Sequence, residues 1–65
     1  MKKYVVKVID ANDVQEYLEK YNDYGCWTTN DLERAIKYSY SEAEDVADMI
    51  WRDYTVKAAL AEELE

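Results

Sequence analysis

The hydrophobic pattern of residues 41–54 predicts an amphipathic helix. Apolar residues recur at three- and four-residue spacing, as on the buried face of a helix: Ala43, Val46, Ala47, Ile50 and Tyr54. Acidic residues fall mostly away from that stripe: Glu42, Glu44, Asp45 and Asp48. Ser41 followed by Glu44 fits a capping box, in which each side chain takes up a free backbone N–H, so the helix is expected to begin at Ser41.

Residues 3–9 predict a strand, because they are rich in β-branched side chains and are followed by turn-forming residues. Strand alternation would direct three of them toward the core: Tyr4, Val6 and Val8. Val5 and Ile9 make the alternation imperfect, which is typical of a sheet that is covered on part of its second face.

Residues 14–21 fit two structures. Four apolar residues match a helical stripe: Val14, Tyr17, Leu18 and Tyr21. Alternatively, a strand ends in a turn at residues 22–25, which contain the chain's one glycine, and returns through residues 26–28. The periodicity leaves both structures open.

Residues 56–64 are also ambiguous, since they contain many strong helix formers. A strand from Tyr54 to Leu60 is preferred, because Tyr54, Thr55 and Val56 all favour strands. Its inward side would consist of alternate residues: Tyr54, Val56, Ala58 and Leu60.

A second, short helix is predicted after Thr28. Asn30 is the expected cap, and an apolar face would follow: Leu32, Ala35 and Ile36. Tyr38 and Tyr40 are expected to close the core between the two helices, and Trp27 and Trp51 to be core residues.

Several short groups of residues resemble very small proteins encoded by bacteriophages and mobile elements: Tyr4-Val5-Val6-Lys7, Tyr17-Leu18, Trp27-Thr28, Leu32 with Ala35 and Tyr38, and Ala43 with Val46-Ala47. The resemblance implies a three-stranded meander, a short helix, a longer helix and a closing strand. It therefore favours a strand over residues 14–21. Such proteins share no common activity, but they include anti-CRISPR proteins and other inhibitors of host enzymes. The shared positions are packing and turn positions, so no functional residue carries over.

The fold expected for the single domain of residues 1–65 is α+β. It has a small antiparallel sheet of three or four strands with two helices on one face, in the order β-β-β-α-α-β.

Charge indicates the kind of partner. Fifteen Asp and Glu against eight Lys and Arg give a net charge of −7, which disfavours direct binding to nucleic acid or anionic membranes and favours basic partners. No apolar run reaches the roughly 20 residues that a membrane helix needs. A single cysteine and no signal-peptide pattern indicate a reducing cytoplasm, and the resemblance to phage proteins implies that it is the cytoplasm of a bacterial host.

Enzyme chemistry is not expected, because the chain has no histidine and no glycine-rich phosphate loop. Cys26 is interpreted as a small apolar strand or core residue. A calcium loop beginning at Asp10 would need glycine and glutamate where the chain has Gln15 and Tyr21, so Asp10 and Asn12 are expected to form local turn hydrogen bonds. Neither a metal nor a cofactor is predicted.

The acidic surface is the candidate functional site. Carboxylates three or four positions apart on a helix could imitate successive backbone phosphates and occupy a basic groove. The predicted partner-binding residues are Glu42, Glu44, Asp45, Asp48, Asp31 and Tyr24. The predicted function is that of a phage-type, anti-CRISPR-like inhibitor that blocks a basic nucleic-acid-binding surface of a host protein. The alternative is a self-associating structural or regulatory protein, for instance a homodimer, of a mobile element.

Overall fold

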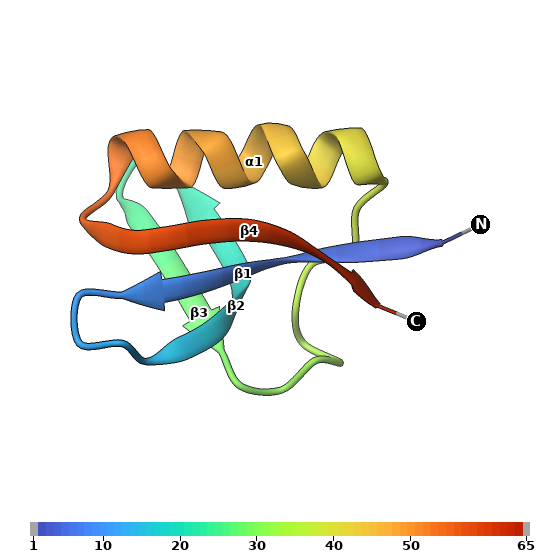
Figure 1. Ribbon diagram of the computed structural model, residues 1–65, viewed down its shortest axis with the longest axis horizontal. Helices are drawn as coiled ribbons and strands as arrows, with labels where there is room; N and C mark the ends of the chain where they lie inside the picture. The colour runs from blue at the N-terminus through green and yellow to red at the C-terminus, as the bar shows by residue number, and fades with distance from the viewer. Residues whose placement is uncertain (1, 65) are drawn as a thin grey trace.

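The computed structural model describes residues 2–64. It contains four strands and one helix: β1 (Lys3–Asp10), β2 (Gln15–Asn22), β3 (Gly25–Thr29), α1 (Tyr40–Asp53) and β4 (Val56–Leu64). The strands form one antiparallel sheet in the order β3-β2-β1-β4, and α1 packs across one of its faces (Figure 1). The α+β class and the antiparallel sheet are confirmed, whereas the second helix is absent from the described residues.

The core lies between the sheet and α1. Six buried residues form it: Val6, Val8, Leu18, Ala43, Ala47 and Ile50. Val46 and Tyr54 pack against this cluster, so the predicted helical stripe is confirmed. Val5 points to the opposite face of the sheet and is still only 1% exposed, so the expected partial cover of the second face is confirmed as well.

Helix α1 begins two residues earlier than predicted. Ser39, not Ser41, is the N-cap, and its capping box is completed by Glu42, not Glu44. Both serines fit the motif, but the backbone of Tyr38 is hydrogen-bonded to that of Tyr4 in β1. The chain therefore leaves the sheet at Tyr38, and the next residue can start the helix.

The expected short helix after Thr28 is wrong. Asp31, rather than Asn30, accepts a hydrogen bond from the backbone of Glu33, but only a single turn forms over residues 31–34. The turn ends because the backbone N–H of Ile36 donates to the carbonyl of Leu18 in β2, which holds the chain against the sheet. Within residues 2–64, no helix is long and apolar enough to cross a membrane.

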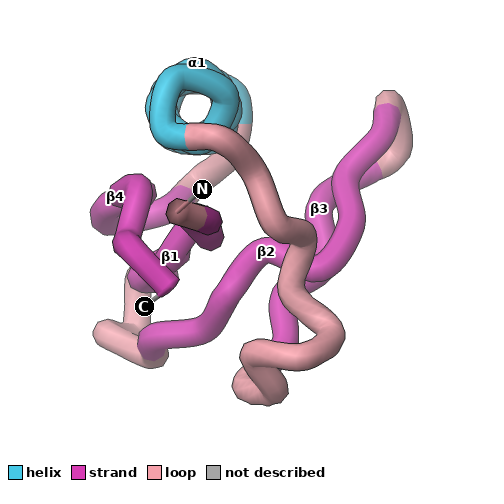
Figure 2. Tube along the Cα trace, turned by 90° about the vertical axis from the view of Figure 1, so that its right-hand side faces the viewer, coloured by secondary structure: helices cyan, strands magenta, loops and turns pink. Residues whose placement is uncertain are grey.

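Residues 15–22 form a strand, which settles the first ambiguity in favour of the β2–β3 hairpin. β2 pairs with β1 only over residues 15–17 and then diverges from it (Figure 2). Where the two strands separate, the backbone of Ile36 is hydrogen-bonded to β2 and that of Tyr38 to β1. The segment after β3 is extended there because the free backbone groups of both strands need hydrogen-bond partners.

Residues 56–64 also form a strand, as preferred. Of its predicted inward side, Tyr54 and Val56 do pack against the core, whereas the prediction is wrong for Ala58 and Leu60. The register shifts near Lys57, because Ile9 pairs with Ala58 whereas Asp10 pairs with Val56. Such an extra residue reverses the alternation beyond it. Ala59 and Ala61 consequently pack against the core, and Leu60 points away from it and is 50% exposed.

The expected burial of the tryptophans is wrong. Trp27 is 45% and Trp51 57% exposed, whereas every fully buried side chain is aliphatic. Tyr38 packs against the core, but Tyr40 is about half exposed, with its ring in edge contact with that of Tyr4 at 5.1 Å. The core under the single helix is therefore aliphatic, and aromatic rings pack only at its margin.

Candidate functional site

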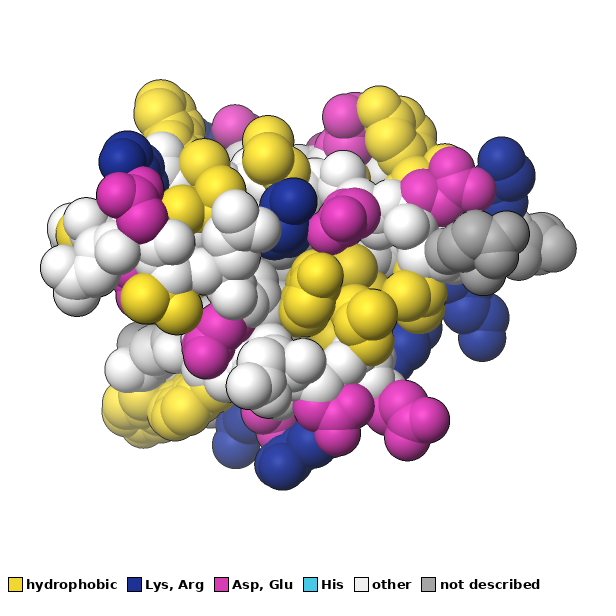
Figure 3. Space-filling model, turned by 60° about the horizontal axis from the view of Figure 1, so that its bottom comes forward, with side chains coloured by type: hydrophobic (Ala, Val, Ile, Leu, Met, Phe, Trp, Pro, Cys, Tyr) yellow, Lys and Arg dark blue, Asp and Glu magenta, His cyan; other side chains and the backbone are white. Residues whose placement is uncertain are grey.

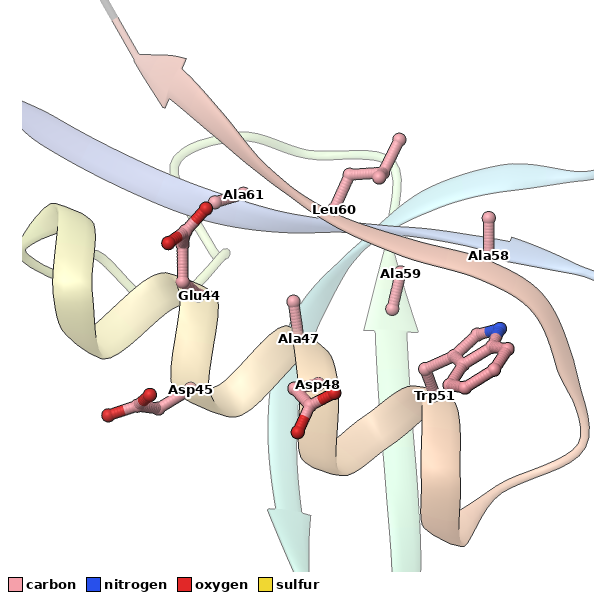
Figure 4. A pocket seen from close by; sticks show the side chains of 9 residues that line it. All are labelled: Glu44, Asp45, Ala47, Asp48, Trp51, Ala58, Ala59, Leu60 and Ala61. Carbon is pink, nitrogen blue, oxygen red and sulfur yellow. The ribbon is translucent and has the colours of Figure 1, made fainter.

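A groove of about 540 Å³ lies between α1 and β4. Its lining residues come from one side of the helix and from the middle of the strand: Glu44, Asp45, Ala47, Asp48, Trp51, Ala58, Ala59, Leu60 and Ala61 (Figure 4). Glu44 and Trp51 extend toward β4, whereas Asp45 points away from the strand. This groove unites three of the six predicted binding residues with an exposed indole.

The groove is electrostatically one-sided. Three of its lining residues are carboxylates, and none is basic. Asp48 forms an ion pair with Arg52 at 3.0 Å on the exposed helix surface, and such pairs contribute little. Glu44 accepts a hydrogen bond of 2.7 Å from the hydroxyl of Tyr40, which raises the pKa of Tyr40. The negative charge of Glu44 is therefore held in place beside the groove.

The helix dipole does not account for the three acids of the groove, although Asp48 also pairs with Arg52 one turn later. A helix dipole favours carboxylates within the first turn, and Glu42 alone occupies that turn as an acid. Glu44, Asp45 and Asp48 lie beyond it. Moreover, Glu44 and Asp48 are four residues apart, where like charges destabilise a helix by about 0.2–0.5 kcal/mol.

The groove reaches the outer edge of the sheet. Four consecutive strand residues, 58–61, border it, although their side chains alternate between the two faces of β4. β4 is the last strand of the sheet, so residues of both its faces can line a hollow at its outer edge. On the side away from α1, hydrophobic side chains gather into a patch with charged groups around it (Figure 3).

Glu42 is separated from the other helix acids. Its carboxylate accepts hydrogen bonds from the backbone and the hydroxyl of Ser39 in the capping box. It borders a different hollow, of about 290 Å³, together with Lys2, Lys3 and Lys37. The predicted acidic face is thus divided between two sides of α1.

Asp31 and Tyr24 also lie apart from the groove. Asp31 follows β3 and accepts a local turn hydrogen bond of 3.0 Å. Tyr24 is 94% exposed in the turn of the β2–β3 hairpin. The tip of this hairpin and β4 lie on opposite sides of α1 (Figure 2).

Exposed aromatic residues also lie on both faces of the β2–β3 hairpin. Tyr21, Tyr24 and Trp27 are all exposed on it, and the ammonium of Lys20 lies 5.1 Å from the centre of the Trp27 ring. No hydrogen bond or ion pair joins these residues to the acids of α1 in the described structure. The hairpin surface is therefore distinct from the groove.

Cys26 lies in β3 and packs partly against the core. Burial raises the pKa of its thiol, so less thiolate forms at neutral pH. Within residues 2–64, no three acidic or cysteine side chains cluster in a way that could hold a metal ion. Asp10 accepts hydrogen bonds from the backbone of Asn12 and Val14, which confirms the predicted turn role of Asp10.

Trp51 and Leu60 are the groove residues that the sequence analysis missed. Trp51 lies off the apolar stripe of the helix, and this offset was a usable sign that it faces outward. Leu60 gave no such sign, because its orientation depends on the register shift near Lys57.

Comparisons of the chain with protein families, with curated proteins and with solved structures found no match. What the protein does must therefore be inferred from its own residues and their arrangement.

Proposed function

We propose that the protein binds a basic surface of a larger protein through the groove between α1 and β4. The observation that carries this proposal is the lining of the groove, in which Glu44, Asp45 and Asp48 accompany Trp51 and no residue is basic. Arg52, which pairs with Asp48 on the exposed helix surface, lies outside the lining. Carboxylates attract and orient a basic partner, and an exposed indole binds arginine or lysine through its ring face.

The role proposed for this binding is inhibition. A basic surface that these carboxylates occupy is no longer free to bind the phosphates of a nucleic acid. The resemblance to small phage proteins supports the choice of a nucleic-acid-handling host protein as the target, in the manner of an anti-CRISPR protein. The net charge of −7 supports a protein partner rather than direct contact with nucleic acid.

Charge reversal tests the proposal. The double variant Glu44→Lys/Asp48→Lys should lose capture of the partner from a bacterial host extract, because it places two positive charges in the groove. The control Asp23→Lys/Glu33→Lys changes the net charge equally at exposed residues outside the groove and should retain capture. Circular dichroism should show that both variants remain folded, since exposed substitutions usually change stability by less than about 0.5 kcal/mol.

Salt and nucleic acid provide two further readouts on the captured complex. Raising the salt to about 0.5 M should release the partner, because the charges are then screened within a few ångströms. Double-stranded DNA or RNA should compete with the protein for the partner. Capture that survives groove reversal, high salt and competing nucleic acid would contradict the proposal and direct attention to the aromatic surface of the β2–β3 hairpin.

Self-association is the second candidate function. Two features that oligomer interfaces commonly cover favour it: the exposed Leu60 and the outer edge of β4, with which no other segment of residues 2–64 pairs. Sedimentation of the protein alone distinguishes the two functions. A dimer that dissociates when Leu60 is changed to Lys would support self-association, whereas a monomer leaves the groove free for a basic partner.

A further inference from the structure

The outer edge of β4 has the features of a strand that accepts another strand. β4 is nine residues long and lies at the end of the sheet, and no other segment of residues 2–64 pairs with its outer side. Proteins usually block such an edge with charges, proline or bulges. In β4 the register shift and Lys57 lie near one end of the strand, and Glu62 and Glu63 lie near the other. Residues 58–61 between them are uncharged, and three of the four are alanine. The backbone of another chain can therefore approach the middle of β4 closely.

The acids of α1 are spaced to match the side chains of such an added strand. β4 runs back along α1 (Figure 1), so a segment paired with its edge would also follow the helix. Glu44 and Asp48 are separated by about 6 Å along the helix axis, at 1.5 Å per residue. Side chains on one face of a strand recur about every 6.6–6.8 Å. Two alternate side chains of the added strand would therefore meet Glu44 and Asp48 in turn.

The two faces of the groove call for different side chains. Toward α1, the added strand meets Glu44, Asp48 and the ring of Trp51, which suit arginine or lysine. On its other face it meets Leu60, which is 50% exposed and suits an apolar side chain. Alternation of basic and apolar residues satisfies both faces at once.

We infer that the groove binds an extended basic segment of its partner as a fifth strand on β4, with basic residues at every second position facing α1. The inference rests on the proposed function, because it specifies how the basic partner is held. Backbone hydrogen bonds to β4 provide binding that is independent of sequence, and the alternating contacts provide specificity.

A second copy of this chain is the competing occupant of the edge. Symmetric pairing of two β4 strands would bring the Glu44 and Asp48 side chains of both copies to one interface, between two molecules that each carry a net charge of −7. Like charges across an interface disfavour association. Charge complementarity therefore favours a basic segment over a second copy.

The test uses synthetic peptides of about eight residues, a typical strand length. The first alternates arginine with valine or threonine, and its control has the same composition with the arginines in adjacent pairs. Two further peptides repeat the alternating sequence with N-methyl groups on one or the other set of alternate residues, so that each has only one edge able to form backbone hydrogen bonds. Binding is followed by the fluorescence of Trp51 in a Trp27→Phe protein, which retains no other tryptophan.

The alternating peptide should bind at least about tenfold more tightly than its control, because only it satisfies both faces of the groove. One N-methylated peptide should lose binding and the other retain it. Hydrogen exchange should slow, when the alternating peptide is added, at those amides of residues 58–61 that point away from β1.

The outcomes of these experiments distinguish failure of strand addition from failure of the proposed function. If both N-methylated peptides bind equally, strand addition is overturned, while loss of binding in Glu44→Lys/Asp48→Lys would still support the acidic groove. If no basic peptide binds, or if binding is indifferent to that charge reversal, the strand-addition inference is wrong together with its acidic contacts. A dimeric protein in which the β4 amides that point away from β1 are already protected would mean that a second copy occupies the edge.

Discussion

The part of the molecule that α1 covers and the β2–β3 hairpin use their hydrophobic residues in opposite ways. Beneath α1, the buried side chains are aliphatic and small or medium-sized, with Val6, Val8 and Ile50 at most 4% exposed. On the hairpin, Tyr21, Tyr24 and Trp27 are exposed. The aliphatic core therefore lies between α1 and the sheet, with tyrosines packed at its margin, and the aromatic side chains of the hairpin remain exposed.

This difference follows from the thickness of the core. One helix on a four-stranded sheet encloses a small core, which is filled by alanine, valine, leucine and isoleucine side chains. Both tryptophans lie outside this core, Trp27 on the hairpin and Trp51 in the groove. Tyrosine and tryptophan are also the residues that contribute most at protein interfaces, so both aromatic surfaces are suited to contacts.

The largest expected effect is at the centre of the core. Ile50→Ala should lower the free energy of unfolding by about 2–5 kcal/mol, because Ile50 is fully buried and the substitution leaves a cavity. A domain of this size has only about 3–5 kcal/mol of stability, so the variant should be largely unfolded. Chemical denaturation followed by circular dichroism measures the change. A variant as stable as the wild type would show that the core lies elsewhere.

The two serines before and in α1 test where the helix begins. Ser39→Ala should lower the free energy of unfolding by about 0.5–2 kcal/mol through loss of the N-cap. Ser41→Ala is the matched control, and it should be neutral or slightly stabilising, because Ser41 lies inside the helix and alanine is the better helix former. Denaturation curves for both variants measure the effects. The reverse order would place the helix start at Ser41.

Substitution of each exposed tryptophan tests whether the arginine peptide binds in the groove or at the hairpin. Trp51→Leu should weaken binding of the alternating arginine peptide by about 0.5–2 kcal/mol, the range of a cation–π contact. Trp27→Leu, on the hairpin, should leave that affinity unchanged. Isothermal titration calorimetry of the folded variants measures both affinities. Equal losses would indicate that the groove is not the specific site.

Alkaline pH should destabilise the protein through Tyr38. Burial above all, with a smaller contribution from Tyr21, raises the pKa of Tyr38 to about 12 from an ordinary value of 10.0. Between these values the unfolded chain ionises while the folded protein keeps Tyr38 protonated, so the free energy of unfolding falls as the pH rises. Two pKa units correspond to about 2.7 kcal/mol, which the partial exposure of Tyr38 reduces to about 1 kcal/mol.

A Tyr38→Phe variant isolates that effect, because it removes the ionisable group while the other tyrosines and the lysines still titrate. Denaturation from about pH 9 to about pH 12 should show a shallower loss of stability in the variant than in the wild type. Parallel curves for the two proteins would show that Tyr38 ionises equally in the folded and unfolded states.

The smallest effect is expected at the tip of the hairpin. Tyr24→Ala should change the free energy of unfolding by less than about 0.5 kcal/mol, since the side chain is 94% exposed. It should also leave binding of the arginine peptide unchanged. If instead this variant fails to capture the partner from the host extract, Tyr24 contributes to the interface as the sequence analysis predicted.

Local sequence patterns correctly predicted the features that are determined by residues close together in the chain. The apolar stripe of residues 43–54 identified the buried face of α1, and the alternation of residues 3–9 identified the core side of β1. The turn at residues 22–25 was recognisable from its glycine and polar residues. The acids Glu44, Asp45 and Asp48 were recognised as a surface cluster, but their proximity to β4 was not.

Contacts between segments far apart in the chain decided the rest. The pairing of Tyr38 with Tyr4 chose Ser39 over Ser41 as the helix cap, and the bond from Ile36 to Leu18 stopped a second helix. The register shift near Lys57 turned Leu60 outward and created the groove together with Trp51. Side-chain periodicity specifies which residues share a face of an element. Only hydrogen bonding and packing between elements specify where the element begins and what its exposed face lies against.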